Sequence, residues 1–344
     1  MKTKAAVLVT PKAPLWIAED IEMPALKPGQ VMVRISHTGI CGSQIMEING
    51  LRGPDRWLPH MLGHEASGTV IETGAGVRAV SPGDNVVLSW IKGPGMDVSG
   101  AQYHHGNTII NSGPVTTFSE YTIVSENRCT KISGDIPLAT AALLGCAVLT
   151  GFGSVNNFVN DLKGRSIAIF GLGGIGLCAL MAAKFHGFHP IIAVDVLDKK
   201  LELSRELGAS HLVNANKLDV IEYIEELTEG GVSFSVEASG STEVIETAFK
   251  CVHRGGGICV FAGHPPHGGM IRLDPFDLIC GKRILGTWGG ESRPDRDIPF
   301  LVDLYSKGIL PLEKLITNTY ELDDINLAIT EMRDNPLGRI LIKM

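Results

Sequence analysis

Residues 166–176 read SIAIFGLGGIG, and this stretch decides the fold of the middle of the chain. Its first five residues are typical of a buried strand, and a glycine-rich turn then opens a helical run. Gly171 permits the tight turn, Gly173 lets the backbone approach a pyrophosphate, and Gly176 lets the helix pack closely on the strand. Because the N-terminus of a helix also favours negative charge, this stretch predicts a dinucleotide site.

A second predicted strand, 191–194, ends at Asp195, which lies 19 residues beyond Gly176. A carboxylate at this position can accept hydrogen bonds from the hydroxyls of the adenosine ribose. Asp195 therefore favours NAD over NADP. The alternative interpretation is an ordinary helix-capping or solvated aspartate.

Strands and helices alternate through the middle of the chain, which is typical of a parallel sheet wrapped by helices. The predicted strands are 167–170, 191–194, 234–237 and 257–261, and the predicted helices are 175–186, 199–207 and 243–252. We expect this α/β domain, a doubly wound parallel sheet, to span residues 150–288.

The rest of the chain has a different pattern, with short β-type runs broken by Gly and Pro. These runs are 30–35, 67–71 and 84–88. In the tail, helical segments 298–306 and 322–333 precede a final strand at 339–343. We expect a β-rich domain over residues 1–149 that is completed by residues 289–344.

Composition excludes several classes of function. The 344 residues carry a net charge of −7 and no basic run, which argues against a nucleic-acid partner. No apolar stretch approaches the roughly 20 residues of a membrane span, and the N-terminus lacks the features of a signal peptide, so we expect a cytoplasmic protein. The seven cysteines form no CxxC pair, which favours free thiols or metal ligands.

A possible metal site is spread over three places in the β-rich domain. Cys41 lies in GICGS, His64 and Glu65 lie in GHE, and Cys146 follows a glycine. Two thiolates and one imidazole would leave the fourth position of a tetrahedral zinc ion open, as in catalytic zinc sites. From the residues alone, ordinary packing of these side chains is equally open.

Several motifs resemble the zinc-dependent medium-chain dehydrogenase/reductase family, in the same order and over nearly the whole chain. They are GICGS at 39–43, GHEASG at 63–68, PGDNV at 82–86, GC at 145–146 with TG at 150–151, the nucleotide turn, and GRILI at 338–342. The resemblance implies an α/β protein with a GroES-like catalytic domain, a Rossmann domain, and an active cleft between them.

The resemblance also implies an activity, the NAD-dependent and reversible oxidation of an alcohol or polyol hydroxyl to an aldehyde or ketone. Zinc would be held by Cys41, His64 and Cys146, with Glu65 behind the metal as an occasional further ligand. Ser43 would take the alcohol proton and pass it toward the nicotinamide ribose, unless it only caps a turn.

The same resemblance extends the set of site residues. The residues expected to bind the cofactor are Thr150, Gly171, Gly173, Gly174, Ile175, Gly176, Asp195, Lys200 and Arg339. Candidates for lining the substrate pocket are Trp57, Trp90, His264 and Trp288, although each could equally be a core residue. We expect a homodimer or homotetramer that pairs through strands 257–261 and 283–287.

Three departures from the family pattern bear on the site. Gln44 stands where an Asp normally supports the zinc-bound His, so we expect a more electrophilic zinc. Met46 stands where many relatives have a relay His, so the proton path would end at the ribose and water. Residues 91–116 contain no Cys, which predicts a single catalytic zinc and no structural zinc, and the adjacent His104 and His105 are interpreted as surface residues.

Two other functions remain open from the sequence. One is a zinc-free, NADPH-dependent enone or quinone reductase of the same superfamily. Such an enzyme would lack the set of possible zinc ligands formed here by Cys41, His64 with Glu65, and Cys146. The other is a non-catalytic NAD-binding protein, which would have no use for an open zinc position.

Overall fold

The computed structural model describes residues 1–158, 165–334 and 337–344, and the chain divides into two compact units. The first unit combines Met1–Cys146 with Arg293–Met344, and the second is Ala147–Ser292. The boundaries at 146/147 and 292/293 lie close to the 149/150 and 288/289 boundaries expected from the sequence.

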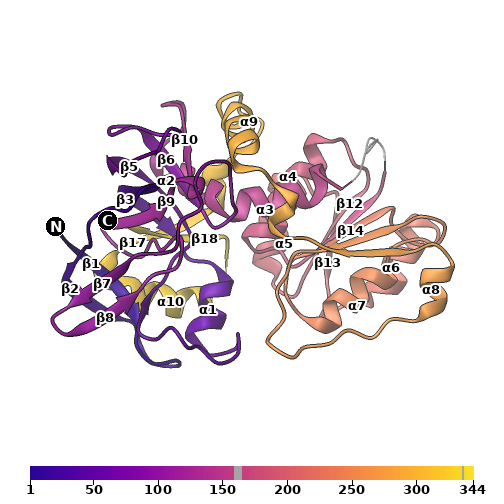
Figure 1. Cartoon of the computed structure of the whole chain (residues 1–344). Helices are drawn as coiled ribbons and strands as arrows, with labels where there is room; N and C mark the ends of the chain where they lie inside the picture. Colours follow the sequence, from indigo (N-terminus) through magenta and orange to yellow (C-terminus); the bar gives the residue numbers. More distant parts are fainter. Residues whose placement is uncertain (159–164, 335–336) are drawn as a thin grey trace. The chain divides into compact units, whose positions relative to one another are not determined.

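The first unit is rich in β-structure (Figure 1). Its strands are β1 (Lys2–Leu8), β2 (Trp16–Glu22), β3 (Gln30–Gly39), β4 (His60–Met61), β5 (Glu65–Thr73), β6 (Asn85–Ser89), β7 (Gln102–His105), β8 (Thr108–Asn111), β9 (Tyr121–Ser125), β10 (Cys129–Lys131), β17 (Ile316–Glu321) and β18 (Arg339–Lys343). Its helices are α1 (Gly42–Ile48), α2 (Leu138–Ala142), α9 (Pro294–Ser306) and α10 (Ile325–Asp334).

These strands form a small closed barrel and a larger sheet. The barrel has the order β1-β2-β7-β8-β4, and the sheet has the order β10-β6-β5-β3-β18-β17, with β9 also paired to β3. β18, near the end of the chain, pairs antiparallel with β3, where Leu341 is opposite Gly39. β3 also pairs antiparallel with β5, where Thr38 is opposite Ala66. The end of β3 and the start of β5 therefore lie side by side.

The second unit contains a six-stranded parallel sheet. Its strands are β11 (Ile167–Phe170), β12 (Ile191–Asp195), β13 (His211–Asn214), β14 (Phe234–Glu237), β15 (Ile258–Phe261) and β16 (Arg283–Gly286). Its helices are α3 (Ala147–Asn156), α4 (Gly174–Phe185), α5 (Asp198–Leu207), α6 (Val220–Thr228), α7 (Thr242–Lys250) and α8 (Pro275–Ile279).

The strand order β13-β12-β11-β14-β15-β16 is that of a Rossmann sheet, which confirms the expected fold class. β11, the strand of the quoted stretch, is central, and all four of its side chains are buried. One face of the sheet packs on α6 and α7, where Val220, Ile224, Ala248 and Phe249 meet strand residues such as Phe170. A fully buried parallel strand has no alternation of polar and apolar residues, which explains the run IAIF.

The structure adds to and corrects the predicted elements. The strand β13 was not predicted, because HLVN is short and partly exposed, and the helix α6 that follows it was not predicted either. The helix predicted at 298–306 begins earlier, at Pro294, because proline is well tolerated in the first turn of a helix. β15 was expected at a subunit seam together with β16, but it is hydrogen-bonded on both sides, so that part of the prediction is wrong.

Within the described residues, no single helix is long and apolar enough to cross a membrane. The consecutive helical segments Leu138–Gly145 and Ala147–Asn156 meet the length and composition criteria only when they are combined.

Candidate active site

Cys41 and His64 are brought together by the pairing of β3 with β5. Cys41 follows the end of β3 and is the N-cap residue of α1. His64 immediately precedes β5, and the backbone before it turns at Gly63, whose φ is +91°. A Cβ atom at Gly63 would lie 2.3 Å from Thr117 Oγ1, so only glycine permits this approach.

Cys146 reaches the same place because the preceding glycine packs tightly on the sheet. A Cβ atom at Gly145 would lie 2.3 Å from the carbonyl oxygen of Leu88 and 2.9 Å from the Cα atom of Glu65. The hydroxyl of Ser89 also donates a hydrogen bond to the Gly145 carbonyl, at 2.7 Å. A larger residue at position 145 would therefore move Cys146 away from the start of β5.

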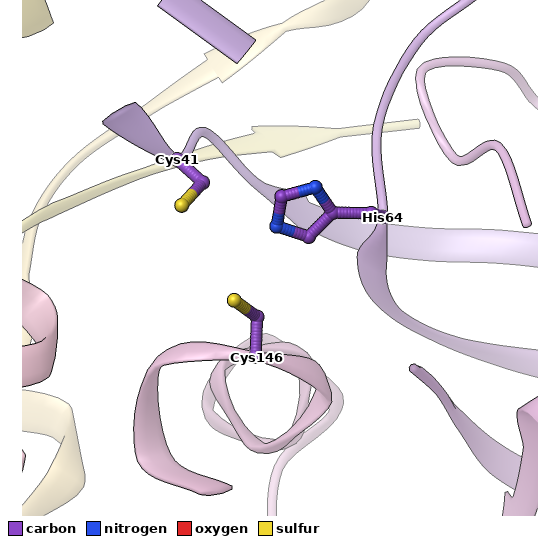
Figure 2. Close-up of side chains that lie close together, drawn as sticks. All are labelled: Cys41, His64 and Cys146. Carbon is purple, nitrogen blue, oxygen red and sulfur yellow. The ribbon is translucent and has the colours of Figure 1, made fainter. Parts of the chain in front are cut away.

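The side chains of Cys41, His64 and Cys146 point toward one another (Figure 2), and their donor atoms all lie within 4.8 Å of one another. His64 Nε2 is buried and has no hydrogen-bond partner among the described residues. The pKa of the Cys41 thiol lies well below its usual value. A hydrogen bond with Cys146 lowers this pKa most, and the nearby His64 and Arg339 lower it further, whereas burial raises it. Two cysteine sulfurs and one imidazole are the donor set of a catalytic zinc site.

The helix α1 carries the residues that follow the first ligand. Ser43 Oγ is buried and has no partner among the described residues, so it is available to a bound molecule. The side chain of Gln44 is buried and reaches His64, with its Nε2 atom 2.8 Å from His64 Nδ1. Met46 is half-buried on the same helix.

Glu65 and Arg339 form a buried ion pair that sequence reasoning did not anticipate. They are the first residues of β5 and β18, and they are 0% and 2% exposed. Because Arg339 lowers the pKa of Cys41, this guanidinium contributes to the electrostatics of the thiolate site. The structure thus connects Arg339, expected to bind the cofactor, with Glu65, expected behind the metal.

A cavity of about 650 Å³ in the first unit reaches His64. Its walls include the side chains of Gln44, Glu47, Trp57, His60, His64 and Thr116. Trp57, a predicted pocket residue, lines this cavity and is 57% exposed. Trp90, another predicted pocket residue, lies edge-on to His64 with ring centroids 6.4 Å apart.

Glu47 and His60 on the wall of this cavity form a second polar group together with Asp55, which contacts His60, and sequence reasoning missed this group. His60 Nδ1 contacts the Met61 carbonyl at 3.0 Å, and its Nε2 lies 2.7 Å from Asp55 Oδ2 and 3.9 Å from Glu47 Oε1. Since a carbonyl only accepts hydrogen bonds, Nδ1 must carry a hydrogen and Nε2 faces the two carboxylates. The only sequence signal was a second His four residues before His64.

The glycine-rich turn of the second unit has the geometry of a phosphate-binding loop. Gly171 has a φ of +83°, and a Cβ atom there would lie 2.8 Å from the nitrogen of Ser239. A Cβ atom at Gly176 would lie 1.9 Å from the Gly171 carbonyl oxygen. At Gly173, the N-cap of α4, a Cβ atom would meet nothing within 4 Å, so the space before the helix is open. Such an open helix N-terminus suits a pyrophosphate.

Asp195 lies at the end of β12 beside this turn and is 8% exposed. Its Oδ2 accepts a hydrogen bond from Leu172 N–H, and its Oδ1 accepts from the N–H groups of Val196 and Leu197. Lys200 Nζ lies 3.6 Å from Asp195 Oδ2. Since an ionised carboxylate accepts about four hydrogen bonds, capacity remains for a ligand hydroxyl.

The other predicted residues of the second unit are placed as follows. Thr150 Oγ1 is buried in α3 and lacks a partner among the described residues. Ile175 is half-buried in the first turn of α4 and packs close to Gly151 of α3. His264 is exposed and contacts the Pro265 carbonyl through Nδ1, and Trp288 is 71% exposed.

Comparisons with known proteins agree with this geometry. Residues 27–134 match the alcohol dehydrogenase GroES-like domain, and residues 174–307 match the zinc-binding dehydrogenase domain. The chain is 34% identical to an S-(hydroxymethyl)glutathione dehydrogenase from Photobacterium damsela subsp. piscicida, over 99% of this chain and 100% of the relative. It belongs to the zinc-binding alcohol dehydrogenase family. The resemblance inferred from the motifs is thereby confirmed, and the protein is an oxidoreductase of the zinc-containing alcohol dehydrogenase type.

Solved structures place this dehydrogenase among enzymes with different named substrates. The crystal structure of benzyl alcohol dehydrogenase from Acinetobacter calcoaceticus matches with a TM-score of 0.91 and 31% identity, over 100% of this chain and 99% of that one. The 2R,3R-butanediol dehydrogenase from Bacillus subtilis matches with a TM-score of 0.80 and 28% identity, over 99% of each chain. Zinc and a nicotinamide dinucleotide are typical cofactors of this family.

Proposed function

We propose that this dehydrogenase reversibly oxidises a hydroxyl group of an alcohol or polyol to an aldehyde or ketone, with NAD as the hydride acceptor. The observation that carries the proposal is the convergence of the donor atoms of Cys41, His64 and Cys146 within 4.8 Å. Three protein ligands leave one coordination position of a zinc ion open for substrate, whereas a structural zinc ion is usually bound by four protein ligands.

The candidate site residues of the first unit then have the following roles. Cys41, His64 and Cys146 would hold a zinc ion, which supplies a Lewis acid that polarises the substrate oxygen. Ser43 Oγ, buried and without a partner among the described residues, takes the hydroxyl proton of the alcohol while passing its own proton on. Because Met46 cannot relay a proton, Ser43 would pass its proton to a ribose hydroxyl of the bound cofactor or to water.

The second unit would hold the cofactor. The open space before α4 at Gly173 would admit the pyrophosphate, and the carboxylate of Asp195 would accept hydrogen bonds from the ribose hydroxyls. The negative charge of Asp195 repels the additional phosphate of NADP, while the ion pair with Asp195 engages Lys200. The buried hydroxyl of Thr150 and the side chain of Ile175 are proposed to position the nicotinamide.

The polar cavity wall favours a substrate with more than one hydroxyl group. The carboxylate of Glu47 has no hydrogen bond within the described residues, and the basic side chain that contacts it is His60, at 3.9 Å. A carboxylate with free lone pairs can accept hydrogen bonds from hydroxyl groups. Glu47, Asp55 and His60 thus support a polyol more than an aromatic alcohol such as that named for the Acinetobacter enzyme.

We propose one tightly held zinc ion per chain. The segment 91–116 contains no cysteine, and it is held instead by protein contacts, since β7 and β8 pair within the barrel. Tyr103 is fully buried and its hydroxyl accepts a hydrogen bond from Ile123 N–H at 2.8 Å. Two tightly held zinc ions per chain, measured by metal analysis, would contradict this.

We propose that two copies pair through β16, giving a homodimer or half of a homotetramer. β16 is the outer strand of its sheet, so its outer edge offers unpaired backbone groups. Exposed apolar side chains lie near it, including Ile279 at 78% and Leu285 at 42%. Sedimentation of the full chain tests this, and a monomer at micromolar concentration would refute it.

A substrate screen tests the proposed reaction. Zinc-loaded protein is incubated with NAD or NADP and with polyols, 2,3-butanediol, benzyl alcohol or S-(hydroxymethyl)glutathione, and formation of the reduced cofactor is followed. We expect polyol turnover with NAD that is abolished in Cys146→Ser, whereas Cys259→Ser, a buried cysteine of the second unit, retains it. Zinc-independent reduction of enones with NADPH would support the reductase alternative, and NAD binding without turnover would support the non-catalytic one.

A further inference from the structure

Gln44 bridges the first two proposed zinc ligands. Its side chain is 1% exposed and lies in the first turn of α1, directly after Cys41. The backbone N–H of Cys41 donates a hydrogen bond to Gln44 Oε1 at 2.7 Å, and Gln44 Nε2 lies 2.8 Å from His64 Nδ1. Both ends of the amide are therefore engaged, one by each ligand residue.

The first of these contacts fixes the orientation of the amide. A backbone N–H can only donate, so the atom of Gln44 that faces Cys41 must be the carbonyl oxygen. The amide NH₂ group, which can only donate, must then face His64 Nδ1. His64 Nδ1 is consequently an acceptor, and the ring hydrogen of neutral His64 resides on Nε2.

That hydrogen lies where a metal ion would coordinate. Among the described residues, His64 Nε2 has no hydrogen-bond partner, and the ring faces the sulfur atoms of Cys41 and Cys146 (Figure 2). A metal-binding histidine normally donates its other ring N–H to an acceptor, which fixes the opposite tautomer. The hydrogen-bond polarity at Gln44 is thus the reverse of what zinc binding through Nε2 requires.

We propose that Gln44 is a positioning residue that holds His64 in the tautomer opposing zinc, and so weakens zinc binding by this chain. Binding requires the amide to turn over so that its oxygen accepts from His64 Nδ1–H. Two donors, the Gln44 NH₂ and the Cys41 N–H, then face each other and one hydrogen bond is lost. A carboxylate at this position accepts from both groups at once. The proposal rests on the zinc assignment made above.

Chelator competition with the zinc-loaded full chain tests the consequence. Gln44→Glu keeps the shape of the side chain but only accepts, so we expect it to hold zinc about 10–100-fold more tightly than the unmodified chain. Gln102→Glu adds the same charge at an exposed position on the wall of the same cavity, and we expect no change. Equal affinities of the unmodified chain and Gln44→Glu, or equal tightening by both variants, would overturn the proposal.

A spectroscopic measurement separates orientation from charge. Nitrogen NMR of the full chain labelled at histidine and freed of metal reports which ring nitrogen carries the hydrogen, with His64→Gln identifying the signal. We expect Nε2–H in the unmodified chain and Nδ1–H in Gln44→Glu. Nδ1–H in the unmodified chain would refute the proposal even if the variant did not fold. Zinc retention in Cys146→Ser equal to that of the unmodified chain would instead refute the zinc assignment.

Discussion

Asp195 accepts a hydrogen bond from the backbone N–H of Leu172, with a distance of 2.7 Å between Oδ2 and the nitrogen. This bond ties the end of β12 to the glycine-rich turn, 23 residues earlier in the sequence. The carboxylate that was predicted to accept hydrogen bonds from the ribose therefore also shapes the loop that is proposed to receive the pyrophosphate. One substitution at this position should affect both tasks.

Replacing Asp195 by Asn removes the charge with little change of shape. We expect the KM for NAD to rise about 10–100-fold, because hydrogen bonds to a charged group contribute roughly 1.5–3 kcal/mol. Turnover with NADP should rise relative to NAD. Asp198→Asn is the matched control, since Asp198 is a nearby acidic residue of α5 whose carboxylate contacts Lys217 and Asn214. Unchanged cofactor preference in Asp195→Asn would remove Asp195 from the cofactor site.

Alanine at two glycines should separate cofactor binding from folding. Gly173→Ala places a methyl group in open space before α4, so we expect the free energy of unfolding to fall by less than about 1 kcal/mol. The affinity for NAD should nevertheless fall at least tenfold, because the methyl group would occupy the space proposed for the pyrophosphate. Gly176→Ala places it 1.9 Å from the Gly171 oxygen and should cost about 1–3 kcal/mol of stability. Calorimetry and NAD titration measure both effects. Full NAD affinity in Gly173→Ala would show that the open space does not receive the pyrophosphate.

Glu47→Gln should discriminate between substrate classes. We expect the KM for a polyol to rise about tenfold or more with little change in kcat, because hydrogen bonds to the carboxylate contribute roughly 1.5–3 kcal/mol. Benzyl alcohol, which has no second hydroxyl, serves as the control substrate, and Glu72→Gln, at an exposed position of β5, serves as the control variant. A parallel rise for both substrates would mean that Glu47 supports the fold rather than recognises a hydroxyl group.

Glu126 should make the stability of the first unit depend on pH. Burial opposes ionisation of this carboxylate, but backbone N–H groups of Arg78, Met96 and Ala79 outweigh it and hold its pKa below the usual value. Stabilisation is then complete above the unfolded pKa of about 4.3 and is lost as the pH falls through the lower folded value.

The corresponding variant is Glu126→Gln. At pH 7 we expect a loss of about 1–3 kcal/mol, since a buried set of charged hydrogen bonds is replaced by neutral ones. Urea unfolding of both proteins should show this difference shrinking as the pH falls below 4. A difference that is constant between pH 7 and pH 3 would exclude ionisation of Glu126 as its cause.

Local patterns were sufficient to predict the half of the candidate site that is proposed to bind the dinucleotide. The strand at 167–170, the glycine turn and the acid at 195 are close in sequence, and each glycine has a backbone or packing reason that is visible in the pattern. The zinc donors were different, because Cys41 and Cys146 lie far apart along the chain. From residues alone they could not be distinguished from buried thiols, and only the family resemblance selected them.

The sequence by itself determined the parallel sheet and its glycine-rich turn, and its resemblance to the family selected the three proposed zinc donors. Only the tertiary structure decided that Arg339 pairs with Glu65, that Asp55 contacts His60 of the cavity wall, and that the Gln44 amide donates to His64. The physical reason is that strand pairing sets which distant residues become neighbours. The direction of a hydrogen bond then depends on a third group, here the backbone N–H of Cys41, which no local pattern reveals.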